Sequence, residues 1–281
     1  MKPERREYSR TLYLAEQAMR RVYVGGWPAK LWAKVPGRTR VQRLEHDVDL
    51  GRPPGRPPLR IAFASDLHIG PTTPPEVLDN AFGLLAEARP DVLALGGDYV
   101  FLGALHERVA ELKRRVAAVP APLKVAVLGN HDFWARPERI ADALAEIGVQ
   151  VLINRALRLA PPHDDLAIVG LDDPLTGKVA AEAVSQAADV PRKIALCHSP
   201  DAIYALGRTD ISLLLTGHTH GGAICLPGYR PLVMPSRAGR LYPFGLHQVN
   251  GFRLFVSRGV GGSLLPIRTY APPDVAVFAI R

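Results

Sequence analysis

Aspartate, asparagine and histidine side chains recur in five short polar segments of this chain. The segments are SDLH at 65–68, GGD at 96–98, GNHD at 129–132, CHSPD at 197–201 and GHTHGG at 217–222. They contain Asp66, His68, Asp98, Asn130, His131, His198, His218 and His220. Oxygen and nitrogen donors without thiolates suit Mn²⁺, Fe or Zn²⁺ better than a structural cysteine–zinc site.

The number of donors indicates more than one metal ion. A structural zinc ion takes four ligands in a tetrahedron, and at least seven donors are present here. Two ions about 3.5–4 Å apart can polarise a phosphoryl group, lower the pKa of a water and steady the attacking and leaving oxygens. A carboxylate is the natural bridge between such ions, because it has two oxygens. The five segments therefore predict a two-metal site suited to phosphoryl chemistry.

Each polar segment follows a short apolar run that predicts a buried β-strand. We expect strands at 59–65, 91–97, 123–129, 149–155, 165–171, 192–198, 211–217, 252–257 and 274–280, with helices at 75–88, 104–118, 137–147 and near 178–188. Strands that alternate with helices indicate an α/β layered fold. Residues just past the carboxyl ends of strands converge on one rim of such a sheet, where ligands bind.

The motifs D-x-H, GGD, GNHD, a lone histidine and GHTH, in this order, resemble the calcineurin-like metallophosphoesterases. The resemblance covers about residues 59–281, and HSPD at 198–201, LPG at 226–228 and SRGVGGS at 257–263 resemble the YkuE-type subfamily in particular. Members of that subfamily include UDP-2,3-diacylglucosamine pyrophosphatases. The resemblance implies a four-layer α/β sandwich, in which two mixed β-sheets are flanked by helices.

The resemblance also implies a role for each polar residue. The first metal would be held by Asp66, His68 and His220, the second by Asn130, His198 and His218, and Asp98 would bridge them. His131 would lie near the leaving-group oxygen as general acid or electrostatic stabiliser, oriented by Asp132. We expect two divalent ions as cofactors, with Mn²⁺ as our first choice and Fe or Zn²⁺ as alternatives. The expected enzyme is a metal-dependent hydrolase of phosphoric ester or anhydride bonds.

Each motif alone has a structural explanation. Asp66 and His68 could belong to a turn, and Asn130 could simply tolerate a left-handed backbone. Their joint occurrence at strand ends favours catalysis over a non-catalytic scaffold, because no expected ligand is missing. Arg258 and Arg268 flank the glycine-rich segment 259–262 and could clamp a phosphate. A structural arginine is the alternative, and we keep Arg268 as the substrate-binding candidate.

The net charge of +8 lies in the N-terminal fifth of the chain. Residues 1–60 hold 14 Lys and Arg against 6 Asp and Glu, whereas residues 61–281 hold 21 of each sign. This balance argues against a nucleic-acid groove in the main domain. The segment GRPPGRPP at 51–58 predicts a semi-rigid linker. We therefore divide the chain into a basic N-terminal segment with its linker, 1–58, and a catalytic domain, 59–281.

A basic amphipathic helix is predicted before the linker. Its apolar face comprises Leu12, Ala15, Met19 and Val22, and Trp27 and Trp32 follow among Lys30 and Lys34. Residues 8–35 suit a membrane surface, with aromatic rings at headgroup level and cations on the polar side. A helix packed on the catalytic domain fits the same pattern equally well.

Composition sets the expected location and substrate. The two cysteines suggest no disulfide framework, no apolar run reaches the roughly 18 residues of a membrane span, and the N-terminus lacks the apolar core of a signal peptide. We expect a cytoplasmic enzyme, peripheral at the inner membrane face. Its substrate would be a phosphate-containing small molecule or lipid, either a lipid-linked or a nucleotide-sugar compound such as UDP-2,3-diacylglucosamine. The alternative is a soluble phosphodiesterase of broad specificity for small diesters or cyclic nucleotides.

Overall fold

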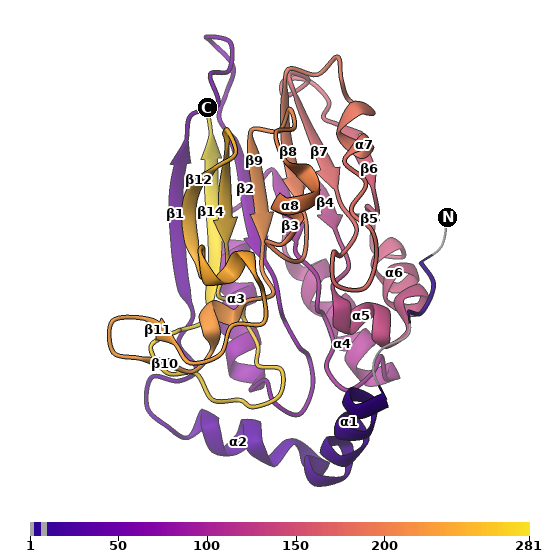
Figure 1. The fold of residues 1–281 in the computed structure, drawn as a ribbon, viewed down its shortest axis with the longest axis vertical. Coiled ribbons are helices and arrows are strands. Elements are labelled where there is room, and N and C mark those ends of the chain that lie inside the picture. Colours follow the sequence, from indigo (N-terminus) through magenta and orange to yellow (C-terminus); the bar gives the residue numbers. More distant parts are fainter. Residues whose placement is uncertain (1–2, 7–9) are drawn as a thin grey trace.

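The computed structural model describes residues 3–6 and 10–281. Two six-stranded mixed sheets pack face to face, and helices cover their outer surfaces (Figure 1). Apolar side chains from both sheets, among them Phe63, Phe255 and Phe278, fill the space between them. Two sheets bury their inner faces in this way to form one core. The predicted α/β sandwich of two mixed sheets and flanking helices is confirmed.

The first sheet has the strand order β1–β14–β2–β3–β4–β5. Its strands are β1 Gln42–Val48, β2 Leu59–Ala64, β3 Val92–Leu95, β4 Leu123–Ala126, β5 Val149–Val151 and β14 Asp274–Ile280. Strands β2 to β5 are mutually parallel, and β14 runs antiparallel to β2. Buried side chains such as Leu78, Leu112 and Leu144 join the sheet to its outer helices. These helices are α3 Pro75–Glu87, α4 His106–Ala118 and α6 Pro137–Ala145.

The second sheet has the order β12–β13–β9–β8–β7–β6. Its strands are β6 Arg155–Arg158, β7 Leu166–Gly170, β8 Arg192–Leu196, β9 Leu213–Thr216, β12 Gly245–Val249 and β13 Phe252–Val256. Helices α7 Glu182–Ser185 and α8 Ala202–Leu206 pack on its outer face. Two small elements lie between β9 and β12 along the chain. They are a hairpin of β10 Cys225–Leu226 and β11 Arg230–Pro231, and a 3-10 turn, η3 Ala238–Arg240.

Each strand that the sequence predicted from an apolar run is present, with ends that differ by at most four residues. The runs are recognisable because parallel strands buried on both faces are apolar throughout. Strand β1 was not predicted, because its sequence QRLEHDV is mostly polar. It pairs in parallel with β14 at the edge of the first sheet. Residues 42–48 therefore share a sheet with the domain that we placed after residue 58.

The N-terminal segment crosses the end of the molecule at which β2, β3 and β4 finish, at the bottom of Figure 1. It consists of helix α1 Arg10–Val22, the 3-10 turn η1 Val24–Gly26 and helix α2 Trp27–Ala33. The amide of Ala29 donates to the carbonyl of Pro71 at 3.3 Å, and the hydroxyl of Tyr23 donates to the carbonyl of Leu264 at 3.0 Å. Residues 8 and 9 of the predicted membrane segment lie outside the described residues, as does the side chain of Leu12.

Helix α1 buries a different side from the apolar face that its sequence suggested. Ala15 and Val22 are exposed, whereas Glu16 is only 5% exposed. The reason is that α1 lies against a polar region of the catalytic domain, where a carboxylate finds polar neighbours. The apolar side chains of Leu14, Val22 and Val24 are left at the surface.

Candidate active site

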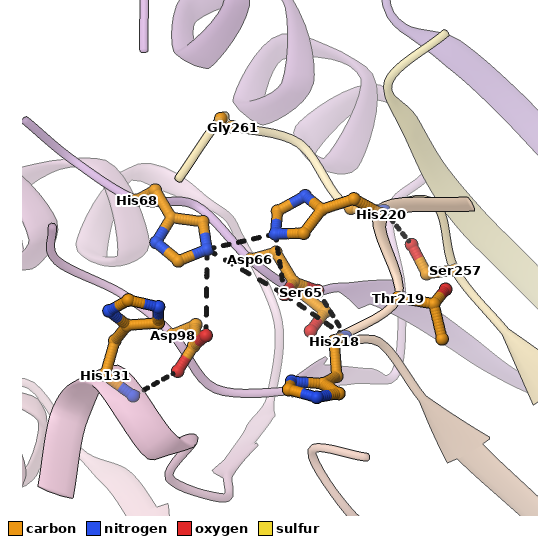
Figure 2. A network of polar contacts seen from close by, with 12 residues as sticks. Ser65, Asp66, His68, Asp98, His131, His218, Thr219, His220, Ser257 and Gly261 are labelled. Atoms are coloured by element: carbon orange, nitrogen blue, oxygen red, sulfur yellow. Dashed lines mark hydrogen bonds and ion pairs between the residues drawn. The ribbon is translucent and has the colours of Figure 1, made fainter. Parts of the chain in front are cut away.

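The carboxyl ends of five strands meet at one place, and the polar segments that follow them form a single cluster (Figure 2). The cluster takes Asp66 and His68 from the end of β2, Asp98 from β3, Asn130 and His131 from β4, His198 from β8, and His218 and His220 from β9. Asn130 and His131 begin the short helix α5 Asn130–Trp134, and His220 begins the 3-10 turn η2 His220–Gly222. Both sheets therefore contribute to the cluster.

A first group of donors consists of Asp66, His68 and His220. The Nε2 atoms of His68 and His220 are 3.2 Å apart, and Oδ1 of Asp66 lies 3.5 Å from the Nε2 of His220. Burial lowers the pKa of His68 well below its usual range and lowers the pKa of His220 to about 4. Both imidazoles are therefore uncharged near neutral pH, which is the form that ligates metals.

A second group of donors surrounds His198. Its Nε2 lies 3.1 Å from Oδ2 of Asp98 and 3.2 Å from Nδ1 of His218, while its Nδ1 donates to the carbonyl of Gly96 at 2.9 Å. Such a backbone contact fixes the tautomer of a metal-binding histidine. Burial opposes the charged form of His198, but the carboxylate of Asp98 outweighs it and raises the pKa well above its usual value.

Asp98 touches both groups of donors. The same Oδ2 atom that faces His198 lies 3.6 Å from Nε2 of His68. Within each of the two groups, one ligand atom per residue can be chosen so that all lie within 4.8 Å of one another. A carboxylate in this position is suited to bridge two cations.

An unpaired buried atom supports the same conclusion. Oδ1 of Asn130 is buried and has no hydrogen-bond partner among the described residues. Burying a polar atom without a partner costs about 1–3 kcal/mol, so the atom fits a role as ligand. The residues present thus fit two divalent metal ions, with one group of donors for each and Asp98 between them.

The loops that carry these candidate ligands have unusual backbone conformations. Asp66, His68, Asp98, His218 and His220 all have φ between 42° and 69°, the left-handed region that side chains other than glycine rarely adopt. Each such residue costs on the order of 1 kcal/mol, and strain of this kind concentrates at functional sites. The surrounding hydrogen bonds must therefore hold the loops in place.

Asp132 supplies part of that support. Its Oδ2 accepts from the main-chain amides of Asp98 at 2.8 Å and Gly129 at 3.0 Å, and its Oδ1 accepts from the amide of Tyr99 at 2.9 Å. Burial, together with the negative charge of the nearby Asp98, raises the pKa of Asp132 to about 7. Among the described residues no hydrogen bond joins Asp132 to the ring of His131. Asp132, which we expected to orient His131, holds the backbone of Asp98, an expected metal ligand.

His131 lies at the edge of the cluster and contacts the N-terminal helix. Its main-chain amide donates to Oδ1 of Asp98 at 2.9 Å, and its ring lies 5.0 Å from that of His68. Its Nδ1 lies 3.9 Å from Oε1 of Glu16 on α1, and the ring of Trp134 packs against it at 5.1 Å. Sequence reasoning missed Glu16, because no local pattern shows that α1 reaches this histidine.

Arg268 is buried behind His220. Its Nη2 lies 2.9 Å from Nδ1 of His220, and its guanidinium also donates to the carbonyls of Arg258 and Gly261. Burial lowers the pKa of Arg268 to about 10. This arginine therefore supports the ring of His220, a position that differs from the open phosphate clamp that the sequence suggested. Arg258 is paired with Asp274 at 2.7 Å.

Comparison with known proteins identifies the family. The model of the calcineurin-like phosphoesterase family matches residues 59–222. The chain belongs to this family. The family resemblance and the predicted enzyme class, a hydrolase of phosphoric ester or anhydride bonds, are thereby confirmed.

Three relatives illustrate the range of the family. YkuE of Bacillus subtilis, a metallophosphoesterase, is 30% identical over 250 residues, which cover 86% of each chain. The phosphodiesterase YaeI of Escherichia coli is 32% identical over 227 residues, covering 79% of this chain and 82% of YaeI. The UDP-2,3-diacylglucosamine pyrophosphatase LpxG of Chlamydia muridarum is 26% identical over 279 residues, covering 78% of this chain and 82% of LpxG.

Proposed function

We propose that the enzyme hydrolyses a phosphodiester or pyrophosphate bond of a lipid-linked or nucleotide-sugar substrate, such as UDP-2,3-diacylglucosamine, at the inner face of a membrane. The surface of α2 carries this proposal. Trp27 and Leu31 are 47% and 55% exposed, and Lys30 and Lys34 are exposed on the same side of the helix. Apolar side chains beside cations suit a helix that lies on anionic lipid.

The exposed apolar surface extends from α2 to the C-terminal part of the chain. Val24 of η1 is 72% exposed, and Leu264 and Leu265 are exposed in the segment to which Tyr23 donates its hydrogen bond. This segment directly follows Gly261, whose carbonyl accepts from Arg268 behind the active site. A lipid-bearing substrate held at this surface would therefore lie near the donor cluster. Among the described residues, no helix has the length and apolar character needed to cross a membrane.

The chemistry follows from the cluster. Two divalent ions, with Mn²⁺ as our choice, would supply Lewis-acid polarisation of the phosphoryl oxygens and an acidified water. The two groups of donors would hold one ion each, and Asp98 would be shared. His131 would donate a proton to the leaving oxygen, and the contact of its Nδ1 with Oε1 of Glu16 at 3.9 Å supports this role.

A soluble phosphodiesterase of small diesters or cyclic nucleotides is the second candidate. The relative YaeI supports this candidate, because it is named a phosphodiesterase, whereas LpxG supports the pyrophosphatase. The two candidates differ in whether the surface of α2 contributes to turnover.

Vesicle binding and turnover test the proposal together. The metal-loaded enzyme and a Trp27→Ser/Leu31→Ser variant would be sedimented with vesicles containing phosphatidylglycerol. We expect the variant to bind at least about tenfold more weakly, because the two large apolar side chains that would move from water into the lipid are missing. Its turnover of UDP-2,3-diacylglucosamine in vesicles should fall relative to its turnover of bis(p-nitrophenyl) phosphate.

Leu246→Ser is the matched control, because Leu246 is an exposed leucine on the edge strand β12. This variant should keep both vesicle binding and the ratio of the two turnover rates. If the α2 variant also kept both, the soluble phosphodiesterase would be the better description of the enzyme.

A further inference from the structure

A hairpin with an exposed apolar surface follows the candidate ligand His220 along the chain. It comprises β10, β11 and the two residues after β11, which together are residues 225–233. Its exposed apolar side chains are Leu226, Tyr229, Leu232 and Val233, with exposed fractions of 47–71%. A soluble protein exposes single apolar residues routinely, whereas a group of them on one surface marks a site of interaction.

Exposed apolar side chains are concentrated in three short segments of the chain. Residues 24–35, 225–233 and 264–270 together comprise 28 of the 281 residues. They carry eleven of the 19 large apolar side chains that are exposed in the described chain. None of the three segments contains an aspartate or a glutamate. A tenth of the chain thus supplies more than half of its exposed apolar side chains.

Hydrogen bonds join the three segments into one surface, with 264–270 in the middle. On one side, the hydroxyl of Tyr23 donates to the carbonyl of Leu264 at 3.0 Å, and Nη1 of Arg38 donates to the carbonyl of Arg268 at 3.0 Å. On the other side, the amide of Cys225 in the hairpin donates to the carbonyl of Thr269 at 3.0 Å. The hairpin and α2 accordingly lie at the same end of the molecule, the lower end in Figure 1.

The charged side chains of this surface have one sign. Residues 17–44 contain seven Lys and Arg, residues 211–273 contain six Arg, and neither range contains an Asp or Glu. The equal numbers of opposite charges in the catalytic domain therefore conceal an uneven distribution. Arg230 is exposed in the hairpin, as are Lys30 and Lys34 on α2. Such a surface is complementary to an anionic partner.

The hairpin is fixed next to the donor cluster. The amide of Leu232 donates to the carbonyl of Ile224 at 3.0 Å, which closes the hairpin at its base. Gly222, two residues after His220, packs so tightly against Pro231 of β11 that a side chain at 222 would collide with it. The hairpin is therefore attached to the turn that carries His220. A surface that binds the hairpin would lie close to the donor cluster.

Aliphatic side chains beside cations indicate the class of partner. Single-stranded nucleic acid is bound by cations and by aromatic rings that stack on the bases, whereas Leu226, Leu232 and Val233 are aliphatic. An anionic bilayer takes up aliphatic side chains below its headgroups and attracts cations to its surface. We propose that the hairpin is a second lipid-contacting element, so that the enzyme docks on an anionic membrane through α2 and the hairpin together. The proposal rests on the proposed function, in which α2 lies on the membrane.

Quenching by brominated lipid locates the hairpin directly and needs no turnover. The parent for this test is the metal-loaded Trp27→Phe/Trp32→Phe protein, in which Trp134 is the remaining tryptophan. Leu232→Trp adds an indole to the hairpin, and the matched control Leu246→Trp adds one to the edge strand β12. With phosphatidylglycerol vesicles that contain dibrominated phosphatidylcholine, the fluorescence added at position 232 should fall at least about twofold, because its indole enters the lipid. The fluorescence added at position 246 should stay unchanged, and equal losses at both positions would overturn the proposal.

Vesicle binding then separates the hairpin from α2. Leu232→Ser/Val233→Ser should bind phosphatidylglycerol vesicles at least about fivefold more weakly, and Leu246→Ser should bind like the parent. If only the α2 variant Trp27→Ser/Leu31→Ser bound more weakly, the role of the hairpin would be refuted and the proposed function would stand.

The remaining outcomes distinguish the two proposals and the alternative occupant. Absence of vesicle binding in the unmodified enzyme would contradict membrane docking by either element. Quenching at position 232, combined with no turnover of UDP-2,3-diacylglucosamine or of bis(p-nitrophenyl) phosphate by the unmodified enzyme, would contradict the proposed function and leave the hairpin's role intact. If the hairpin variant lost self-association in sedimentation velocity and kept its vesicle binding, a second copy of the chain would be the occupant, and the proposal would be wrong.

Discussion

The salt bridge between Arg6 and Asp172 fastens the N-terminal segment to the catalytic domain, and its removal should release helix α1. Nη1 and Nη2 of Arg6 donate to Oδ1 and Oδ2 of Asp172 at 2.9 and 2.8 Å. The guanidinium lies 3.7 Å from the centre of the Phe133 ring. The side chain of Asp172 is 6% exposed and that of Arg6 is 26% exposed. This partly buried, bidentate pair is the ion pair nearest to the N-terminus of α1 in the described chain.

The size of the effect can be worked out from this geometry. A charge-assisted hydrogen bond contributes about 1.5–3 kcal/mol, and an exposed cation–π contact contributes about 0.5–1 kcal/mol. The partial exposure of Arg6 reduces the ion-pair contribution, because water competes for the guanidinium. We expect Arg6→Ala to lower the free energy of opening of α1 by about 2 kcal/mol. Opening would then be roughly thirtyfold more frequent.

Hydrogen exchange of the amides at 10–22, measured by mass spectrometry, follows this opening directly. Protection of α1 should fall in Arg6→Ala and in Asp172→Ala, and the double variant should show a coupling of about 1–2 kcal/mol. Amides of β9 should keep their protection, as should α1 in the control Glu4→Ala, since Glu4 is exposed. A coupling below about 0.5 kcal/mol would refute the reasoning. Turnover should fall with protection, because an open α1 removes Glu16 from His131.

Three further predictions follow from buried groups. Asp98→Asn should abolish hydrolysis and reduce the metal content measured by mass spectrometry, because Asp98 contacts both groups of donors; full activity in this variant would contradict the site. Removal of metal with a chelator should lower the melting temperature, and Mn²⁺ should restore it, because Asn130 Oδ1 and the imidazoles lose a partner. Burial between Phe255 and Phe278 lowers the pKa of His46, so below about pH 6.5 the unfolded chain takes up a proton that the folded chain excludes. Stability should therefore fall as the pH drops from 7.5 to below 6.5, and denaturant titrations should show a smaller fall in His46→Phe; equal falls would contradict the assignment.

The sequence predicted those strands that are apolar at nearly every position. Residues 213–216, LLLT, form a strand buried on both faces, and such a strand needs apolar residues at every position. Strand β1 could not be predicted in this way, because its neighbour β14 lies more than 200 residues along the chain. A strand at the edge of a sheet that is covered on only one side has no continuous apolar run in its sequence. Their position depends on which sheet edge is free.

The cluster of candidate metal ligands was predictable because its residue types are costly to bury without a function. Glu16, Asp132 and Arg268 show the limit of that reasoning. The first reaches the site through the packing of a distant helix, and the second accepts from amides of two separate loops. Arg268 is buried behind His220, and no spacing in the sequence indicates that position. Contacts between elements distant in sequence determine all three roles.

The origin of the donor residues in two different sheets has a consequence for assembly. Asp66 and His68 end a strand of the first sheet and His220 follows a strand of the second, so one ion in this group of donors would cross-link the two halves of the sandwich. The amide of His218 already donates to Asp66 across the same junction at 3.0 Å. A chain in which only one sheet has formed cannot complete either group of donors. Metal uptake would thus report that the two sheets have docked in register. The bound metal would then resist a sliding movement of one sheet against the other.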